Sequence, residues 1–323
     1  MRRRTLLPAA GGLIAAPALA QGTSWPTRPV RVVVTFPPGG SSDIVARVLA
    51  EALSQRMNAR FVVDNRPGAG GTIGAAHVAT QPADGYTLML SNTAPLVTSP
   101  PLYPSVAYDP VAGFAHVTYL GATPIVVVAN KAKVPATDMR GLMDWIRAQP
   151  NPPGYGSSGA GSVGHIVGVL FEKETGLRLT HVPYRGSAPM QADLLGGAIP
   201  LSFDTLPQNI EHIRDGRLRG YAVTSPARQA SAPELPTTAE AGLPNLLAEN
   251  FLGVSGPAGL PPAVVARLNA EITAAVELPS VRARMEEHGV AGAPRGPEDF
   301  TAHVAQQVRD VGGTIRALGI RAE

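Results

Sequence analysis

From Pro29 onward, short runs of β-branched residues alternate with stretches that repeat apolar residues at helical spacing. This alternation is typical of βαβ units on a mostly parallel sheet. Arg31–Phe36 is predicted to be a buried strand, and the helix after it has Ser41 or Ser42 as N-cap and an apolar face. That face consists of Ile44, Val45, Val48, Leu49 and Leu53, and the next elements are predicted at Phe61–Val63 (strand), Thr72–Thr80 (helix) and Tyr86–Leu90 (strand).

A proline-rich passage, Pro95–Pro110, interrupts this alternation. The apolar run after it, Val117–Ala129, is long enough to cross between two sheets, so the first hinge is expected there. Alternation then resumes and predicts a second α/β domain. Its elements are a helix near Asp138–Ala148, strands near Pro153–Ser157, Leu179–Tyr184 and Ile199–Asp204, and helices near Ser162–Glu174, Ala188–Leu195 and Pro207–Arg214.

The last part of the chain is predicted to return to the first domain. Leu218–Thr224 is the expected return strand, and Phe251–Ser255 with two long helical patterns, Pro262–His288 and Pro297–Leu318, completes that domain. The predicted division is therefore residues 1–20 as an export signal, 26–122 plus 225–323 as a discontinuous domain 1, and 123–224 as domain 2. A domain split in sequence implies at least two crossings, and two strands make a hinge.

The first 20 residues have the features of an export signal. Three arginines, Arg2, Arg3 and Arg4, precede an apolar stretch that ends in Ala18-Leu19-Ala20, the small-x-small pattern of a cleavage site. Prolines and glycines break the stretch, which is too short to span a bilayer. Arg3-Arg4-Thr5-Leu6-Leu7 also resembles a twin-arginine signal, so the secretory and twin-arginine routes both stay open.

Charge and cysteine content narrow the possible partners. The three arginines supply the whole formal net charge of +3 and residues 1–20 contain no acid, so the rest of the chain is formally neutral. A neutral chain without a basic run argues against nucleic acid or an anionic membrane surface as partner. The chain has no cysteine, which excludes disulfides, thiolate metal sites, a thiol nucleophile and a lipidated cysteine. We expect a freely diffusing monomer.

Glycine and hydroxyl residues cluster directly after predicted strands and directly before predicted helices, at Gly39-Gly40-Ser41-Ser42, Gly68-Ala69-Gly70-Gly71-Thr72 and Ser157–Ser162. A helix N-terminus presents unpaired backbone N–H groups and a partial positive charge, and glycine lets the backbone approach a ligand. In open α/β sheets these loops lie at the carboxyl ends of the strands, where ligands bind. The three loops together predict a carboxylate site, although such turns also occur for steric reasons alone.

Nucleotide binding, serine hydrolysis and metal binding are less well supported by the sequence than a carboxylate site. Gly68-x-Gly70-x-x-x-Gly74 has looser spacing than a dinucleotide-binding turn, and no acidic residue follows a strand where a ribose would need it. Ala160-Gly161-Ser162-Val163-Gly164 is a variant nucleophile elbow, so a serine hydrolase using Ser162 is the enzymatic alternative. Its histidine is not evident, since His165 is expected to face solvent or its own helix end and His288 closes a helical pattern. The remaining histidines lack metal-site spacing.

Two charged residues at strand ends are ambiguous. Asp204 ends the strand Ile199–Asp204, where it either caps the next helix or contacts an ammonium or hydroxyl group of a ligand. Arg185 follows Tyr184 and is either a solvated surface charge or a ligand clamp, with the solvated interpretation preferred.

Three motifs, in this order, resemble the Bug family of receptors of tripartite tricarboxylate transporters: Phe36-Pro37-Pro38-Gly39-Gly40-Ser41-Ser42-Asp43, Asn65-Arg66-Pro67-Gly68-Ala69-Gly70-Gly71 and His181-Val182-Pro183-Tyr184-Arg185-Gly186. The resemblance extends over essentially the whole chain after the signal, through Asp84-Gly85-Tyr86, Tyr155-Gly156-Ser157-Ser158-Gly159 and Leu194-Leu195-Gly196-Gly197 to Pro257-Ala258-Gly259. Jointly these motifs are highly specific.

The resemblance implies an α/β fold of the two-domain periplasmic binding protein type (Venus flytrap, type II-like), in which each domain is a mixed, mostly parallel sheet flanked by helices. It implies a periplasmic protein without cofactor or catalysis that holds a dicarboxylate, tricarboxylate, acidic amino acid or aromatic acid and delivers it to the transporter's membrane subunits. A two-component sensor is the alternative recipient. The ligand-binding residues it implies are Gly39, Gly40, Ser41, Ser42, Gly70, Gly71, Thr72, Asn92, Ser157, Ser158, Gly161, Ser162, Tyr184 and Asp204.

Two positions depart from the family pattern. Phe251 stands where the family usually has tryptophan near the late strand, so the rim of the cleft is expected to differ. Pro200 replaces a polar residue before the strand that ends in Asp204, and it is expected to shift the direction of that carboxylate.

Overall fold

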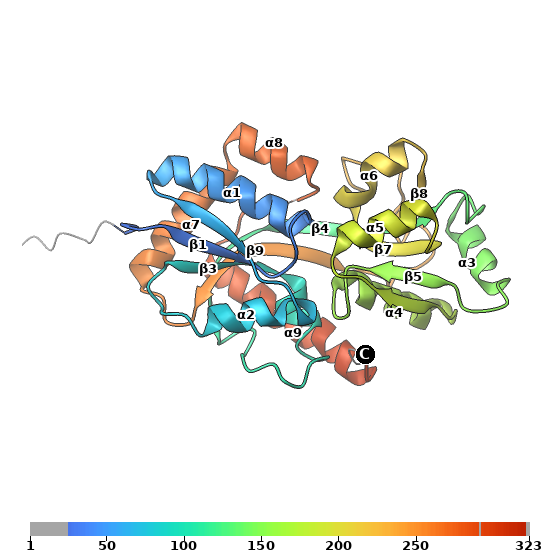
Figure 1. Ribbon diagram of the computed structural model, residues 1–323, viewed down its shortest axis with the longest axis horizontal. Helices are drawn as coiled ribbons and strands as arrows, with labels where there is room; N and C mark the ends of the chain where they lie inside the picture. The colour runs from blue at the N-terminus through green and yellow to red at the C-terminus, as the bar shows by residue number, and fades with distance from the viewer. Residues whose placement is uncertain (1–24, 291, 321–323) are drawn as a thin grey trace, which may run out of the picture.

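Two mixed β-sheets that share one long strand form the framework of the protein (Figure 1). The computed structural model describes residues 25–290 and 292–320, so the predicted export signal lies outside the described residues. The shared strand is β4, Phe114–Asn130. Its first part pairs with β9 (Glu249–Pro257), and from Ile125 onward it pairs with β7 (Leu201–Thr205) and β8 (Leu218–Val223).

The first sheet has the strand order β2-β1-β3-β9-β4. Its parallel part consists of β1 (Val30–Val34) between β2 (Phe61–Asn65) and β3 (Thr87–Asn92), whereas β9 runs antiparallel to both of its neighbours. Helices cover both faces: α1 (Ser41–Met57), α7 (Pro262–Val276) and α8 (Pro279–Glu287) on one side, and α2 (Thr72–Ala79) and α9 (Pro297–Ala317) on the other.

The second sheet has the order β6-β5-β7-β4-β8. The strands β5 (Gly154–Ser157), β6 (Thr180–Pro183) and β7 are parallel, and β4 is antiparallel to β7 and β8. Helices α3 (Met139–Arg147) and α4 (Val163–Thr175) cover one face, and α5 (Ser187–Gly196) and α6 (Leu206–Arg214) cover the other. The predicted two-domain α/β architecture is confirmed.

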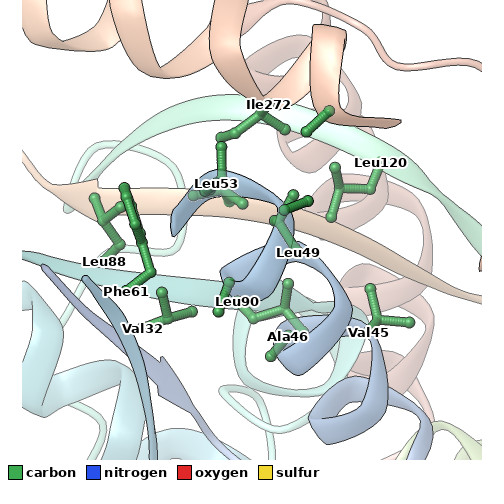
Figure 2. Packing of buried hydrophobic residues seen from close by; sticks show 14 of the residues in the cluster. Val32, Val45, Ala46, Leu49, Leu53, Phe61, Leu88, Leu90, Leu120 and Ile272 are labelled. Atoms are coloured by element: carbon green, nitrogen blue, oxygen red, sulfur yellow. The ribbon is translucent and has the colours of Figure 1, made fainter. Parts of the chain in front are cut away.

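The buried strands carry apolar side chains on both faces because each sheet lies between two helical layers. Val32 faces the cluster under α1, whereas Val33 faces the cluster under α2 and α9. Figure 2 shows Leu49 and Leu53 of α1 packed together with Leu90 of β3 and Ile272 of α7. Each such side chain, fully buried, stabilises the fold by roughly 1.5–3 kcal/mol.

The segment between β8 and β9, residues 225–248, packs on the second sheet. Leu243 and Leu246 join the cluster under α3 and α4, and Leu235 joins the cluster under α5 and α6. The predicted division places this segment in domain 1, but it contains no regular helix or strand whose periodicity could indicate its domain. We therefore propose a domain 2 that ends near residue 248, where the chain enters β9.

One predicted helix is two helices. The pattern over Pro262–His288 breaks at Leu278, which is extended (φ −61°, ψ 128°), and α8 begins at Pro279. Proline lacks the N–H that a helix interior needs and disfavours helical geometry in the residue before it. Among the described residues, none of the helices has the length and apolar character required to cross a membrane.

Candidate ligand-binding site

A small chamber of about 80 Å³ lies between the two domains. Residues of the first sheet's loops and of the second sheet's loops face each other across it, at the carboxyl ends of β1, β3, β5, β6 and β7. Seven of the residues proposed from the sequence line this inner chamber: Gly40, Ser41, Ser42, Asn92, Ser158, Ser162 and Asp204.

Four helices begin at the inner chamber. Ser41 and Ser42 open α1, Val163 and Gly164 open α4, Ser187 opens α5, and Thr205 is the N-cap of α6. The first N–H groups of a helix have no partner within it, and they carry the positive end of the helix dipole. Four such ends around one small space offer backbone donors suited to an anion.

The loop between β1 and α1 is fixed by Asp43, whose carboxylate accepts four hydrogen bonds. Gly39 N donates to Oδ2 (3.0 Å), Asn65 Nδ2 donates to Oδ1 (2.9 Å), and Arg47 donates from Nε and from an Nη (3.0 Å each). Burial by itself would raise the pKa of Asp43, but the bonds from Arg47, Gly39 and Asn65 lower it below its usual value. An ionised Asp43 therefore holds the chain that presents Ser41 and Ser42.

Replacing Asp43 by alanine is expected to lower the free energy of unfolding by about 1–3 kcal/mol, because it removes the buried carboxylate that accepts hydrogen bonds from Gly39, Asn65 and Arg47. The wild-type contribution is present above pH 4 and is lost as pH falls through the lowered folded-state pKa. Urea denaturation at pH 7 and pH 3 measures both effects. A stability difference between wild type and variant that is equally large at both pH values would contradict this assignment.

Asn92 and Ser42 are coupled. Asn92 Nδ2 donates to Ser42 Oγ (3.0 Å), and Asn92 Oδ1 accepts from the backbone N–H of Ala94 (3.1 Å). Because the Ser42 oxygen accepts from the amide, its own hydrogen is free to be donated into the chamber. Asn92 thus orients a donor and also lines the wall itself.

Asp204 is a buried carboxylate in the wall of the inner chamber. It accepts hydrogen bonds from Ser187 Oγ (3.1 Å) and Asn209 Nδ2 (3.4 Å), and burial raises its pKa to about 6. Pro200 leaves the strand intact, since β7 pairs in regular register with β4 and the Pro200 carbonyl accepts from Asn130 N. The expectation that Pro200 deflects Asp204 finds no support in this geometry.

Arg185 is exposed, as the preferred interpretation stated, yet it lines the inner chamber. It also lines a second cavity of about 540 Å³, the outer chamber, and the two chambers share Phe36, Pro37, Ser158 and Gly186 as walls. Of the residues proposed from the sequence, Gly70, Gly71, Ser158 and Tyr184 line the outer chamber. The Tyr184 hydroxyl donates to Asp193 (2.7 Å).

Four proposed residues line neither chamber and instead support the loops. Gly39 donates to Asp43, and Thr72 Oγ1 donates to the Ala69 carbonyl (2.8 Å). Ser157 is fully buried, and Gly161 bonds His165. Phe251 also lies outside both chambers: it is 2% exposed and packs on Phe300 and His303, so its interpretation as part of the cleft rim was wrong.

The Ser162 hydroxyl caps α4, because Oγ accepts the backbone N–H of His165 (3.3 Å). The His165 imidazole accepts the Gly161 N–H through Nδ1 (3.1 Å) and is 6% exposed. Of the two expected orientations, it therefore faces the N-terminal end of its own helix and not solvent. A nucleophile needs a base within hydrogen-bond reach. The geometry around Ser162 is that of a helix cap.

Sequence reasoning missed part of the wall of the inner chamber. The α5 N-terminus resembles the three predicted loops, since Gly186-Ser187 lies between the end of β6 at Pro183 and the start of α5, and this pattern could have predicted it. Asn250, next to Phe251, lines the chamber from β9 and carried no such signal. The other missed residues are Phe36, Pro37, Pro38, Ala94, Ile125, Val163, Gly164, Ala188, Pro189 and Thr205.

Direct hydrogen bonds join the two domains around the chambers. On one side Ser41 Oγ and Thr205 Oγ1 are 2.9 Å apart. On the other, Thr98 Oγ1 donates to the Gly161 carbonyl (2.6 Å), and the Tyr103 hydroxyl donates to Ala160 (3.1 Å). Ser99 Oγ lies between the Gly70 carbonyl (2.8 Å) and the Gly161 carbonyl (3.1 Å). The domains are therefore in contact across the site, as in a closed clamp.

Four histidines make the fold sensitive to acid. Burial lowers the pKa of His116, His165 and His303 to about 4 and that of His181 to about 3. Because an unfolded histidine titrates near 6.5, stability is expected to fall as pH drops from 6.5 towards 4, by about 3 kcal/mol each for His116 and His165. Asp204 opposes this trend: its neutral form favours folding, a contribution lost as pH rises from 3.8 through 6. Melting temperatures that do not fall between pH 7 and pH 4.5 would contradict the prediction.

The fold and the site define a substrate-binding receptor of the periplasmic binding protein class, with its ligand space between two α/β domains. The chain belongs to the family described as tripartite tricarboxylate transporter family receptor, whose match covers residues 45–320. Protein BugT of Bordetella pertussis is 36% identical over 310 residues, covering 95% of this chain and 94% of BugT. An intergenic-region protein of Pseudomonas sp. strain P51 is 37% identical over 92% of this chain and 88% of its own length.

Solved structures agree with this assignment. Rpa4515 of R. palustris, solved with adipate, has a TM-score of 0.87 and 35% identity and covers 92% of this chain and 99% of its own. MatC from Rhodopseudomonas palustris, with bound malate, has a TM-score of 0.82 and 28% identity, covering 88% and 98%. Both of these relatives carry dicarboxylates.

Proposed function

We propose that this protein is a periplasmic solute-binding receptor that captures a small carboxylate in the inner chamber and delivers it to a tripartite tricarboxylate-type transporter. The observation that carries the proposal is the meeting of four helix N-termini, those of α1, α4, α5 and α6, at one chamber. The adipate and malate of the two relatives support a dicarboxylate or a related acid as ligand. On this proposal the protein binds its ligand without converting it.

The proposed ligand contacts are the predicted residues around the two chambers. Ser41, Ser42 and Ser162 would donate from hydroxyls or first-turn N–H groups to one carboxylate. Asp204 accepts from Ser187 and would accept from a hydroxyl or ammonium group of the ligand. Neutral donors held by rigid helix ends suit a receptor, because a buried salt bridge would make release slow.

The interdomain hydrogen bonds suggest how binding is signalled. A ligand that touches both domains favours the closed arrangement, and the membrane subunits would recognise that arrangement. A two-component sensor would read the same closed form, so it is the alternative recipient. Export through residues 1–20 and action as a monomer in the periplasm complete the proposal.

A thermal-shift screen tests the proposal. The protein without residues 1–20 is heated with monocarboxylates, dicarboxylates, tricarboxylates, acidic amino acids and aromatic acids, and with the amide of each acid as matched control. A ligand that binds only the folded state raises the melting temperature by mass action. A rise of several degrees with one acid and none with its amide is expected. No rise with any acid, together with esterase activity abolished by Ser162→Ala, would overturn the receptor in favour of the hydrolase.

A further inference from the structure

Two imidazoles are stacked behind the loop that follows β5, residues 157–162. The rings of His165, from α4, and His181, from β6, lie 4.0 Å apart between centroids with an angle of 13° between their planes. Neither ring lines the inner or the outer chamber. Burying two polar rings costs free energy unless their nitrogens are used, so their hydrogen bonds should indicate what they do.

Each ring is bonded to this loop. His165 Nδ1 accepts the N–H of Gly161 (3.1 Å), and His181 Nε2 lies 2.7 Å from Ser157 Oγ. Ser157 Oγ also donates to the Gly159 carbonyl (3.1 Å) and accepts the Gly159 N–H (3.2 Å). Ser157 Oγ and His181 Nε2 form a hydrogen bond in either tautomer of the ring. Because His165 Nδ1 accepts the Gly161 N–H, the proton of the neutral His165 ring is on Nε2.

The same loop builds both chambers. Ser158 lines the inner and the outer chamber, and Ser162 lines the inner chamber and caps α4. The Gly161 carbonyl accepts the hydroxyl of Thr98 from the other domain (2.6 Å). Gly161 is therefore bonded to the histidine stack through its N–H and to the opposite domain through its carbonyl.

We propose that the His165–His181 stack is a positioning element that holds residues 157–162 in the conformation that binds the ligand and contacts the other domain. The link to the ligand rests on the proposed function, whereas the link to the loop does not. An apolar pair of the same size could fill the space, but it could not accept the Gly161 N–H. His165 acts through that single acceptor nitrogen.

The stack also makes the conformation of the loop depend on pH. Protonation of His165 at Nδ1 removes the acceptor of the Gly161 N–H and places a cation against the second ring. The titratable side chain of Tyr155 also packs against the stack: its ring lies 5.0 Å from that of His181, and its hydroxyl donates to the His165 carbonyl (3.3 Å). Burial raises the pKa of Tyr155, so it stays neutral and does not offset the added charge.

The test compares two variants of one residue. His165→Asn places an amide oxygen near the position of Nδ1 and keeps an acceptor, whereas His165→Phe keeps an aromatic ring on the stack and loses the acceptor. Hydrogen exchange of the Gly161 amide, followed by NMR on the ligand-free protein, is compared with that of Val33 in the core of domain 1. We expect Gly161 to exchange about 10-fold or more faster in His165→Phe at unchanged Val33 protection, and near the wild-type rate in His165→Asn. Equal Gly161 protection in wild type and His165→Phe, or equal loss in both variants, would overturn the proposal.

Two further measurements extend the test: hydrogen exchange of Gly161 as a function of pH, and ligand binding by the same variants. In wild type, protection of Gly161 should be constant from pH 8 to about pH 5 and fall below that, while His165→Phe shows no such step. Adipate and malate are titrated by calorimetry, and binding about 10-fold weaker in His165→Phe with recovery in His165→Asn is expected. If His165→Phe binds an acid with the same affinity as wild type, the stack does not influence ligand binding through the loop. Failure of wild type to bind any carboxylate would overturn the proposed function. The hydrogen exchange of Gly161 would then still decide whether the stack holds the loop.

Discussion

Gly164→Ala is expected to lower the free energy of unfolding by about 3 kcal/mol and to abolish ligand binding. Gly164 is the second residue of α4 and lines the inner chamber, and a Cβ there would overlap the Phe203 carbonyl oxygen of β7. Because the obstacle is backbone in a buried strand, relief requires moving the start of α4 away from the sheet, which displaces Ser162 as well. Overpacking of this kind is among the few mechanisms that produce large losses of stability.

Gly196→Ala is the matched control. Gly196 ends α5 in the same domain, and a Cβ there meets nothing within 4 Å. Alanine has the higher helix propensity, so this variant should melt within a degree or two of wild type or slightly above it. Urea denaturation of both variants measures their stability, and a carboxylate titration measures their ligand binding. A Gly164→Ala protein with wild-type stability would show that α4 does not pack against β7 as described.

Ser42→Asp is expected to weaken carboxylate binding by roughly 100-fold or more while leaving the fold intact. Ser42 lies in the first turn of α1, accepts a hydrogen bond from Asn92 and lines the inner chamber. An aspartate there keeps an acceptor for Asn92 and interacts favourably with the helix dipole, so folding tolerates it. Its charge lies where the ligand carboxylate should lie, and like charges at such distances cost several kcal/mol.

Ser280→Asp provides the control for charge and helix position. Ser280 is likewise the second residue of a helix, α8, but it is exposed and lies in neither chamber. Calorimetric titration of both variants with the acid that gave the largest thermal shift should show wild-type affinity for Ser280→Asp. Equal affinities for Ser42→Asp and wild type would place the carboxylate somewhere other than the N-terminus of α1.

Most of the architecture could be predicted because buried strands and amphipathic helices differ in period and in length. The apolar run Val117–Ala129 also predicted the strand shared by both sheets, which is β4. The domain to which the loop-rich segment 225–248 belongs could not be predicted, because its leucines pack without any periodic pattern. Pro279 could have predicted the break at Leu278, because the residue before a proline disfavours helical geometry. The helical pattern on both sides of it favoured one continuous helix instead.

Most of the predicted chamber residues are glycine or hydroxyl residues that follow a strand, whereas Asp204 was proposed from its place at a strand end and Asn92 from the family resemblance. The glycine and hydroxyl pattern predicted Ser41, Ser42 and Ser162, but not Asn250 or Arg185, whose positions depend on how the two domains face each other. It also included Ser157 and Gly161, which lie in the loop but support it from behind. Whether a loop residue faces the ligand or the core depends on packing that local sequence does not encode.

The central claim is that four helix N-termini between the domains hold a carboxylate. The most direct test is a crystal structure of the protein with the acid that gives the largest thermal shift. We predict a carboxylate group in the inner chamber within hydrogen-bond distance of first-turn N–H groups or hydroxyls of α1 and α4, at Ser41, Ser42 or Ser162. A ligand bound outside that chamber, with only water between α1 and α4, would contradict the account.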